Sequence, residues 1–210
     1  MRSIYLITHA QSLHHIEKKV GGWYDTPLTS IGRNQAEKTG LFLKSNIKTT
    51  DLGLFSSDLK RAKETAEIIS TFLQKTVTLD PRLREMSFGE AEGKPLNWSQ
   101  RHIEPQPHNG DRLNHRIYKH AESRFEVAER IIEALNQILK HNLENTVIVT
   151  HGFASNFLIM AWMKVPAESM GYCDFPAKPS SITLLQEDDL FNNRGVKYLC
   201  STTHLKDDAS

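Results

Sequence analysis

Short apolar runs alternate with segments of helical periodicity along most of the chain, and this alternation limits the possible folds more than any other feature. Residues 4–7, 52–55 and 146–149 are apolar or β-branched throughout, which is typical of strands buried on both faces of a sheet. Apolar residues at helical spacing follow, over residues 31–45, 59–74, 122–141 and 153–163. The alternation predicts an α/β fold, a three-layer sandwich with a mostly parallel central sheet.

The last apolar runs, residues 182–185 and 196–199, flank a polar turn and predict an antiparallel hairpin at one edge of the sheet. A chain of 210 residues suits one domain with a sizeable core, so we expect residues 1–210 to form a single domain. Pro105, Pro107 and Gly110 interrupt the stretch at about 97–119. We expect this stretch to be an excursion laid over the core.

The charge balance gives no bulk argument for nucleic acid or a membrane as a partner. Lys and Arg total 26 against 25 for Asp and Glu, a net charge of 26 − 25 = +1. No apolar run approaches the roughly 20 residues of a membrane span, and the run near the N-terminus is too short for a signal peptide. Cys173 and Cys200 show no metal-ligand spacing, and reduced thiols and a disulfide both stay open. We expect a cytoplasmic enzyme or binding protein.

Two strand ends carry the same kind of residue. Thr8-His9-Ala10 follows the first apolar run, and Thr150-His151-Gly152 follows the run at 146–149. Ligands of α/β sheets collect where strands end, and a small residue lets a ligand approach the backbone closely. His9 alone is equally compatible with a strand cap. The matching His151 favours a site shared by the two histidines.

Two further residues suit the same site. Arg61 lies at the start of the helix predicted after residues 52–55, where backbone N–H groups already favour an anion. Glu85 lies in a loop predicted at 82–93, with Glu90 and Glu92 as competitors for the role of acid. Two histidines, an arginine and a carboxylic acid form a plausible set for phosphoryl transfer: nucleophile, phosphate clamp and proton donor.

These motifs resemble those of the histidine phosphatase superfamily, which has a phosphoglycerate mutase-like fold. The family's motifs are Arg-His-Gly at the first strand end, an Arg on the second helix, a Glu in the next loop and a late His-Gly. The matching positions here are Thr8-His9-Ala10, Arg61, Glu85 and His151-Gly152. Residues 22–29 and 32–37 also resemble the family's loop and helix start. The similarity runs in the right order from about residue 3 to residue 165.

The resemblance implies a mechanism without a metal or another cofactor. His9 would attack phosphorus and become phosphohistidine, while Arg61 and His151 would hold the transferring oxygens. Glu85 would protonate the leaving alkoxide and then activate water. His9 must be neutral to attack, so a group that accepts its other N–H should fix the tautomer. The implied partner is a small-molecule phosphate ester.

The chain departs from the family at four positions. Thr8 replaces an Arg, Ala10 replaces a Gly, His15 replaces an Asn that binds phosphate, and Lys19 stands where many members have Arg. We expect Thr8 and His15 to take the place of the usual phosphate ligands. Each lost charge-assisted hydrogen bond is worth about 1.5–3 kcal/mol, so losing the two bonds of a forked Arg clamp slows the reaction on the order of 10²–10⁴-fold. The candidates to restore the charge are His14, His15, Lys19 and Arg84.

The leading hypothesis is a metal-independent phosphatase that acts on a small phosphorylated metabolite. A phosphoglycerate mutase-type phosphotransferase is the first alternative, although the chain is short for a mutase and shows no clear second anion clamp. A phospho-ligand-binding protein with impaired catalysis is the second, motivated by Thr8. The sequence leaves the natural substrate and the oligomeric state open.

Overall fold

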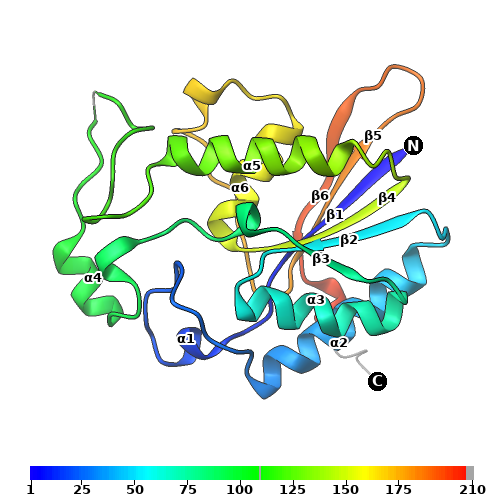
Figure 1. The fold of residues 1–210 in the computed structure, drawn as a ribbon, viewed down its shortest axis with the longest axis horizontal. Coiled ribbons are helices and arrows are strands. Elements are labelled where there is room, and N and C mark those ends of the chain that lie inside the picture. The colour runs from blue at the N-terminus through cyan, green and yellow to red at the C-terminus, as the bar shows by residue number, and fades with distance from the viewer. Residues whose placement is uncertain (109, 207–210) are drawn as a thin grey trace.

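A six-stranded sheet forms the centre of the molecule. A computed structural model describes residues 1–108 and 110–206. The strand order is β3-β2-β4-β1-β5-β6. The pairs β3–β2, β2–β4 and β4–β1 are parallel, whereas β1–β5 and β5–β6 are antiparallel (Figure 1). The strands are β1 (Arg2–Thr8), β2 (Leu52–Ser56), β3 (Val77–Leu79), β4 (Asn145–Thr150), β5 (Ile182–Glu187) and β6 (Arg194–Ser201). The predicted α/β fold with an antiparallel hairpin at one edge is confirmed.

Helices cover both faces of the sheet and complete the three layers. One face packs on α2 (Ser30–Asn46) and α3 (Lys60–Leu73), and the other packs on α5 (Arg124–Leu139) and α6 (Gly152–Trp162). Figure 1 shows the two pairs on opposite sides of the strands. In β1, Ile4 and Leu6 belong to the α5–α6 core and Tyr5 and Ile7 to the α2–α3 core. This alternation explains why the strand is apolar at every position.

The boundaries of the predicted helices hold to within about two residues, and local chemistry explains one of them. Thr29 caps α2, because its hydroxyl accepts the Gly32 N–H at 2.9 Å. The stretch after β1 begins with one helical turn, α1 (Leu13–Ile16). That turn rotates His14 and His15 back toward His9, which an extended loop would not do.

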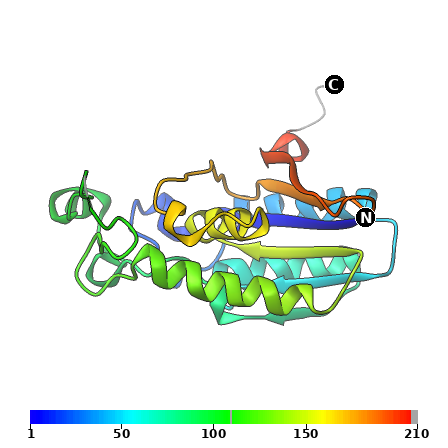
Figure 2. The same cartoon turned by 90° about the horizontal axis from the view of Figure 1, so that it is seen from above.

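The predicted excursion lies beyond the carboxyl ends of the parallel strands, as Figures 1 and 2 both show. It begins with the short helix α4 (Leu96–His102) and continues without regular structure. Its Tyr118 packs against Val20 and Ala91 in a small separate apolar cluster. Asn109 lies outside the described residues. The remaining short elements are 3₁₀ turns at Pro81–Leu83, Gly89–Ala91, Ala167–Ser169 and Thr203–Leu205.

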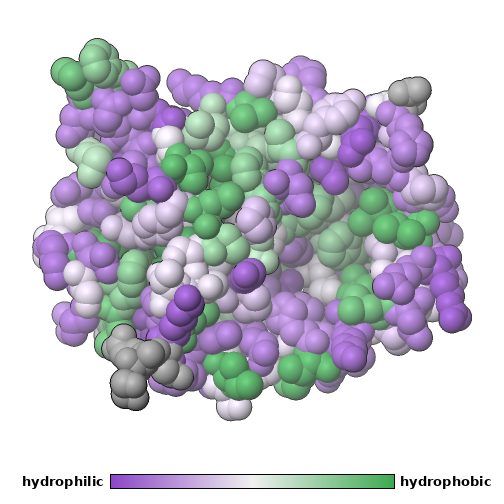
Figure 3. Space-filling model, turned by 180° about the vertical axis from the view of Figure 1, so that it is seen from behind, coloured by the Kyte–Doolittle hydropathy of each residue, from purple (hydrophilic) through white to green (hydrophobic). Residues whose placement is uncertain are grey.

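The exposed large hydrophobic residues come from many different segments of the described chain. Figure 3 shows a mixed surface from behind, with a hydrophobic group at the tip of the β5–β6 hairpin in its upper left corner. Leu190 and Phe191 lie in that turn and are 78% and 73% exposed. Among the described helices, none combines the length and the apolar character needed to cross a membrane.

Candidate active site

Strand register brings His9 and His151 together. β1 and β4 pair in parallel with Thr8 opposite Thr150, so the next residue of each strand is a histidine at the same edge of the sheet. The His9 backbone N–H donates to the Thr150 carbonyl at 2.8 Å and continues the ladder by one bond. Both imidazoles are buried, and their ring centroids lie 5.0 Å apart at an angle of 61°. The juxtaposition expected from the two strand ends is therefore present.

The hydrogen bonds of His9 assign its tautomer. Its Nδ1 lies 2.8 Å from the Ala10 carbonyl oxygen, and because a carbonyl only accepts, Nδ1 carries the proton. Its Nε2 therefore bears the lone pair and accepts the Arg61 Nε–H at 3.2 Å. Burial, then the charge of Arg61, then His15 hold the pKa of His9 well below its usual range. The ring is neutral at pH 7 and presents a free nitrogen lone pair.

Arg61 is a buried cation in the first turn of α3. Its side chain is 1% exposed, and its two Nη groups donate to the carbonyl oxygens of Tyr24 at 3.1 Å and Gly22 at 2.7 Å. Burial lowers the pKa of Arg61, and the charges of Glu85 and Asp25 oppose that shift. Three of the five guanidinium N–H groups are used within the described residues. The other two are free to donate to an anion.

His151 has a hydrogen-bond partner on one ring nitrogen, whereas His9 has partners on both. Its Nε2 lies 2.8 Å from the Ser57 hydroxyl, which also accepts the Leu59 N–H at 3.3 Å. Its Nδ1 is buried and has no hydrogen-bond partner among the described residues. Burial, then Arg61 and His9 hold the pKa of His151 well below its usual range. This second imidazole is therefore neutral, with Nε2 hydrogen-bonded to Ser57 and Nδ1 without a partner among the described residues.

Glu85 is the acid that the structure places at the site. Its carboxylate accepts the Phe153 and Ala154 N–H groups at 3.1 and 3.0 Å, in the first turn of α6, and the Met86 N–H at 3.0 Å. Its carbonyl oxygen accepts bonds from Trp23 Nε1 at 2.7 Å and Arg130 Nη2 at 2.9 Å. Burial raises the pKa of Glu85, although the three backbone N–H groups on its carboxylate and the charge of Arg61 oppose the shift. The group is suited to carry a proton.

The competing acids are placed elsewhere. One carboxylate oxygen of Glu92 accepts the Trp23 N–H, the Ser87 hydroxyl and the Phe88 N–H, at 3.0, 2.8 and 2.9 Å. Glu92 therefore ties two loops together. Glu90 is exposed. Of the three candidates, Glu85 is the one that lines the cavity beside His9.

A cavity of about 200 Å³ joins most of the predicted residues. The predicted residues in its wall are Thr8, His9, His15, Arg61 and Glu85. His151 is not in this wall; it is fully buried, and its ring lies against that of His9. Thr8 is buried, and its hydroxyl lies 3.4 Å from the Ser181 hydroxyl. The residue that replaces the family's Arg thus reaches the cavity as a neutral group.

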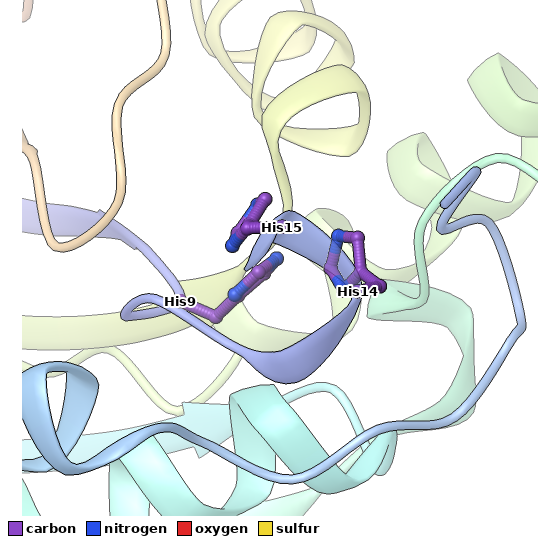
Figure 4. Close-up of side chains that lie close together, drawn as sticks. All are labelled: His9, His14 and His15. Carbon is purple, nitrogen blue, oxygen red and sulfur yellow. The ribbon is translucent and has the colours of Figure 1, made fainter. Parts of the chain in front are cut away.

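His15, at the position of the family's Asn, has one ring nitrogen engaged by the backbone. The Ser12 N–H donates to His15 Nδ1 at 3.1 Å, so in the neutral ring Nε2 carries the proton. The ring stacks on His9, with centroids 5.4 Å apart and an angle of 16° (Figure 4). Burial and Arg61 lower the pKa of His15. Like an amide NH₂, the side chain offers an N–H to an anion.

None of the four residues that could restore the missing charge adds a fixed cation to the cavity. Burial, then His15 lower the pKa of His14 to about 3, and His15 is neutral as well. Lys19 lies 3.0 Å from the Glu17 carboxylate, and Arg84 binds both carboxylate oxygens of Asp58 at 2.7 and 2.6 Å. Their charges are committed to neighbouring carboxylates.

Lys178 is the cation that sequence reasoning missed. It lines the cavity with Thr8 and His9, and its side chain is exposed, with no ion pair or hydrogen bond in the described part of the chain. The Ser180 N–H, two residues later, donates to the Thr8 and His9 carbonyls at 3.0 and 3.2 Å. Because β5 pairs beside β1, the loop that enters β5 is brought to His9. No local pattern reveals that pairing.

His9, His14 and His15 also form the one cluster of potential metal ligands found among the described residues. Each offers one nitrogen, and the three atoms lie within 4.8 Å of one another. Figure 4 shows the rings grouped where the end of β1 meets α1. However, both ring nitrogens of His9 already have partners, Nδ1 the Ala10 carbonyl and Nε2 the Arg61 Nε–H. A metal would have to displace hydrogen bonds beside a buried guanidinium, so the arrangement suits an anion better.

Comparisons with known proteins agree with the family resemblance of the sequence motifs. A model of the histidine phosphatase superfamily (branch 1) matches residues 4–192. A probable phosphoglycerate mutase GpmB of Erwinia tasmaniensis is 32% identical over 182 residues, which cover 80% of this chain and 78% of that protein. The corresponding Yersinia pestis protein is 31% identical over 178 residues, with the same coverage.

Solved structures share the whole architecture. Bacillus stearothermophilus YhfR has a TM-score of 0.79 and 25% sequence identity, with 98% of this chain and 100% of that chain covered. A mycobacterial glucosyl-3-phosphoglycerate phosphatase, solved with VO₃, has a TM-score of 0.77 at 22% identity, with 96% and 100% covered. The second likeness concerns the fold alone.

Proposed function

This chain belongs to the histidine phosphatase superfamily (branch 1), and we propose that it is a metal-independent phosphatase that hydrolyses a small phosphate monoester through a phosphohistidine. One observation carries the proposal. The buried His9 is neutral, its proton is held on Nδ1 by the Ala10 carbonyl, and its Nε2 lone pair meets the Arg61 guanidinium in a cavity. A nucleophile beside an anion clamp is what attack on a phosphoryl group needs.

The first chemical step forms a bond between His9 Nε2 and phosphorus and breaks the bond from phosphorus to the ester oxygen. When the substrate binds, the hydrogen bond from Arg61 to His9 Nε2 breaks. The guanidinium then donates to the phosphoryl oxygens. Glu85 gives its proton to the departing alkoxide, which leaves as an alcohol. Its burial supports this role, because it keeps the proton on the carboxyl to a higher pH.

The second step releases phosphate. The Glu85 carboxylate takes a proton from water, the water oxygen attacks phosphorus, and the bond from phosphorus to His9 breaks. His9 returns to its neutral state with the lone pair on Nε2. His151 assists both steps through its unpartnered Nδ1, which is free to donate to a phosphoryl oxygen while Ser57 holds its other nitrogen.

Lys178 supplies the positive charge that Thr8 lacks. Arg61 and Lys178 are the two cations in the cavity wall, and Thr8, with its neutral hydroxyl, lies in the same wall. An ammonium group on a flexible chain is a point charge without the fork of an arginine. The expected result is a working but slower enzyme than a relative with the Arg.

The phosphoglycerate mutase-type reaction is the second candidate, because curated relatives are described as probable mutases. A mutase must hold a second anionic group of its substrate and protect the phosphohistidine from water. The cavity wall offers two cations, and one of them is exposed. We therefore favour transfer to water. A phospho-ligand-binding protein with impaired catalysis is the remaining alternative.

Hydrolysis of 4-nitrophenyl phosphate tests the proposal. We expect phosphate release, an acid-labile phosphoenzyme in rapid-quench samples, and loss of both in His9→Ala. His102→Ala, which changes an exposed histidine, is the matched control. Phosphate binding without turnover or phosphoenzyme would favour the binding protein, and isomerisation of a phosphoglycerate faster than its hydrolysis would favour the mutase. A cytoplasmic location and the absence of a nucleic-acid partner stay predictions.

A further inference from the structure

A second cavity, of about 380 Å³, adjoins the phosphate cavity. The two share His14, His15, Gly21 and Phe88 in their walls, so they meet along one side. The excursion and the loop after α1 form the remainder of the wall, which is apolar over most of its area. Its apolar residues are Val20, Phe88, Leu96, Ile117 and Tyr118. Pockets with this kind of wall bind the apolar part of small ligands.

Several polar groups in this wall already have partners, whereas the exposed Lys18 side chain has none among the described residues. The hydroxyls of Ser99 and Tyr118 lie 2.5 Å apart and bond to each other. Lys19 is paired with Glu17 and also donates to the Tyr24 hydroxyl at 3.4 Å. No acidic residue lines the cavity. A ligand rich in hydroxyl groups would lose its water here and find few free partners, which is costly.

The walls of the cavity are fastened to each other by backbone hydrogen bonds. The Val20 N–H donates to the Lys94 carbonyl at 2.9 Å, the Gly93 N–H to the Val20 carbonyl at 3.0 Å, and the Leu96 N–H to the Lys18 carbonyl at 3.0 Å. These bonds join the loop after α1 to the start of α4. The apolar cavity is therefore formed before a ligand arrives, which lowers the entropic cost of binding.

We propose that the alcohol part of the substrate occupies this second cavity and is largely apolar, with a ring or a branched chain. The proposal rests on the phosphatase function proposed above and names its substrate class. With the phosphoryl group at His9 and the ester oxygen at Glu85, the alcohol continues past Phe88, which lines both cavities. Sugar and polyol phosphates are disfavoured, because their hydroxyls would face Leu96 and Ile117.

Two esters with similar leaving groups provide the test. 2-Phenylethyl phosphate and glycerol 1-phosphate both release a primary alcohol, so the chemical step differs little between them. We expect kcat/KM to be at least about ten-fold higher for the phenylethyl ester, since burying apolar groups of this size is worth that much. Equal values, or a preference for the glycerol ester, would overturn the inference. Failure to hydrolyse either ester or 4-nitrophenyl phosphate would instead contradict the proposed function.

Two variants locate the preference in this cavity. Leu96→Asn changes a half-exposed wall residue at nearly constant size, and Ile117→Asn changes a partly buried one. Each should lower kcat/KM for the phenylethyl ester several-fold and leave the value for the glycerol ester nearly unchanged. Leu190→Asn, at the exposed tip of the β5–β6 hairpin, is the matched control and should alter neither. If both wall variants keep the full preference and a native thermal transition, the alcohol binds elsewhere and the inference is wrong.

Discussion

The two strand-end histidines begin from nearly the same local sequence and reach different states. His9 and His151 each follow a threonine at the end of a buried parallel strand, and the two strands pair directly. His9 keeps its Nε2 lone pair at the cavity, where its partner is the Nε–H group of Arg61. His151 has its Nε2 fixed by Ser57. Equivalent sequence motifs thus acquire separate roles from the partners of each ring nitrogen.

Removing each imidazole in turn is the strongest test of that difference. We expect His9→Ala to abolish phosphoenzyme formation and to lower kcat by more than about 10⁴-fold, because the nucleophile is lost. His151→Ala should lower kcat by about 10²-fold, the usual effect of losing one donor to the transition state, and should still form phosphoenzyme. Rapid-quench phosphoenzyme trapping distinguishes the two. Similar phosphoenzyme levels in both variants would contradict the assignment.

Glu85→Gln tests whether the proton goes to the leaving group rather than to either histidine. An alkyl ester needs that proton, so we expect its kcat to fall about 10²–10⁴-fold. 4-Nitrophenyl phosphate has a good leaving group and should lose much less in the first step, which a burst of 4-nitrophenol would report. Glu90→Gln, a change to an exposed acid of the same loop, is the control. If phosphoenzyme formation slows equally with the alkyl ester and with 4-nitrophenyl phosphate, Glu85 is not the acid.

The charge around His9 is expected to come partly from Lys178. Lys178→Met should lower kcat/KM about 10-fold, because it removes one charged group from the phosphate. Thr8→Arg should raise kcat/KM, and in that background Lys178→Met should matter less, because both cations serve the same anion. Lys164→Met, which changes an exposed lysine away from the cavity wall, is the control. Additive effects of Thr8→Arg and Lys178→Met would show that the two positions act independently.

The pH dependence gives the smallest but most direct measure of the site's electrostatics. The pKa of His9 is lowered, so its neutral, nucleophilic form persists as the pH falls through 6.5, and the acid limb of kcat/KM should lie below that value. The pKa of Glu85 is raised, so its protonated form persists above 4.5 and is lost as the pH rises further. This alkaline limb should be clear with an alkyl ester, which needs the proton on its leaving group, and Glu85→Gln should abolish it. An acid limb centred at or above 6.5 would contradict a buried, neutral His9.

Much of the fold and part of the site follow from local features of the sequence and could be predicted. The apolar runs identified β1, β2, β4, β5 and β6, and the order of strands and helices determined the class of fold. Parallel strands end at one edge of a sheet, so His9 and His151 were expected to meet. The Arg61 position followed from the helix after β2. Each of these inferences uses contacts near in sequence or a general property of sheets.

Tertiary structure decided the rest, because those contacts join residues far apart in the chain. The N-terminus of α6 distinguishes Glu85 from the competing acids Glu90 and Glu92. The Phe153 N–H, 68 residues later in the chain, donates to the Glu85 carboxylate. The choice of Lys178 over Lys19 and Arg84 depended on β5 pairing beside β1, and on the carboxylates of Glu17 and Asp58. Sequence determined which chemical groups this protein has available at the sheet edge. Long-range packing determined which of them are neutral, which are paired, and which remain free to meet a substrate.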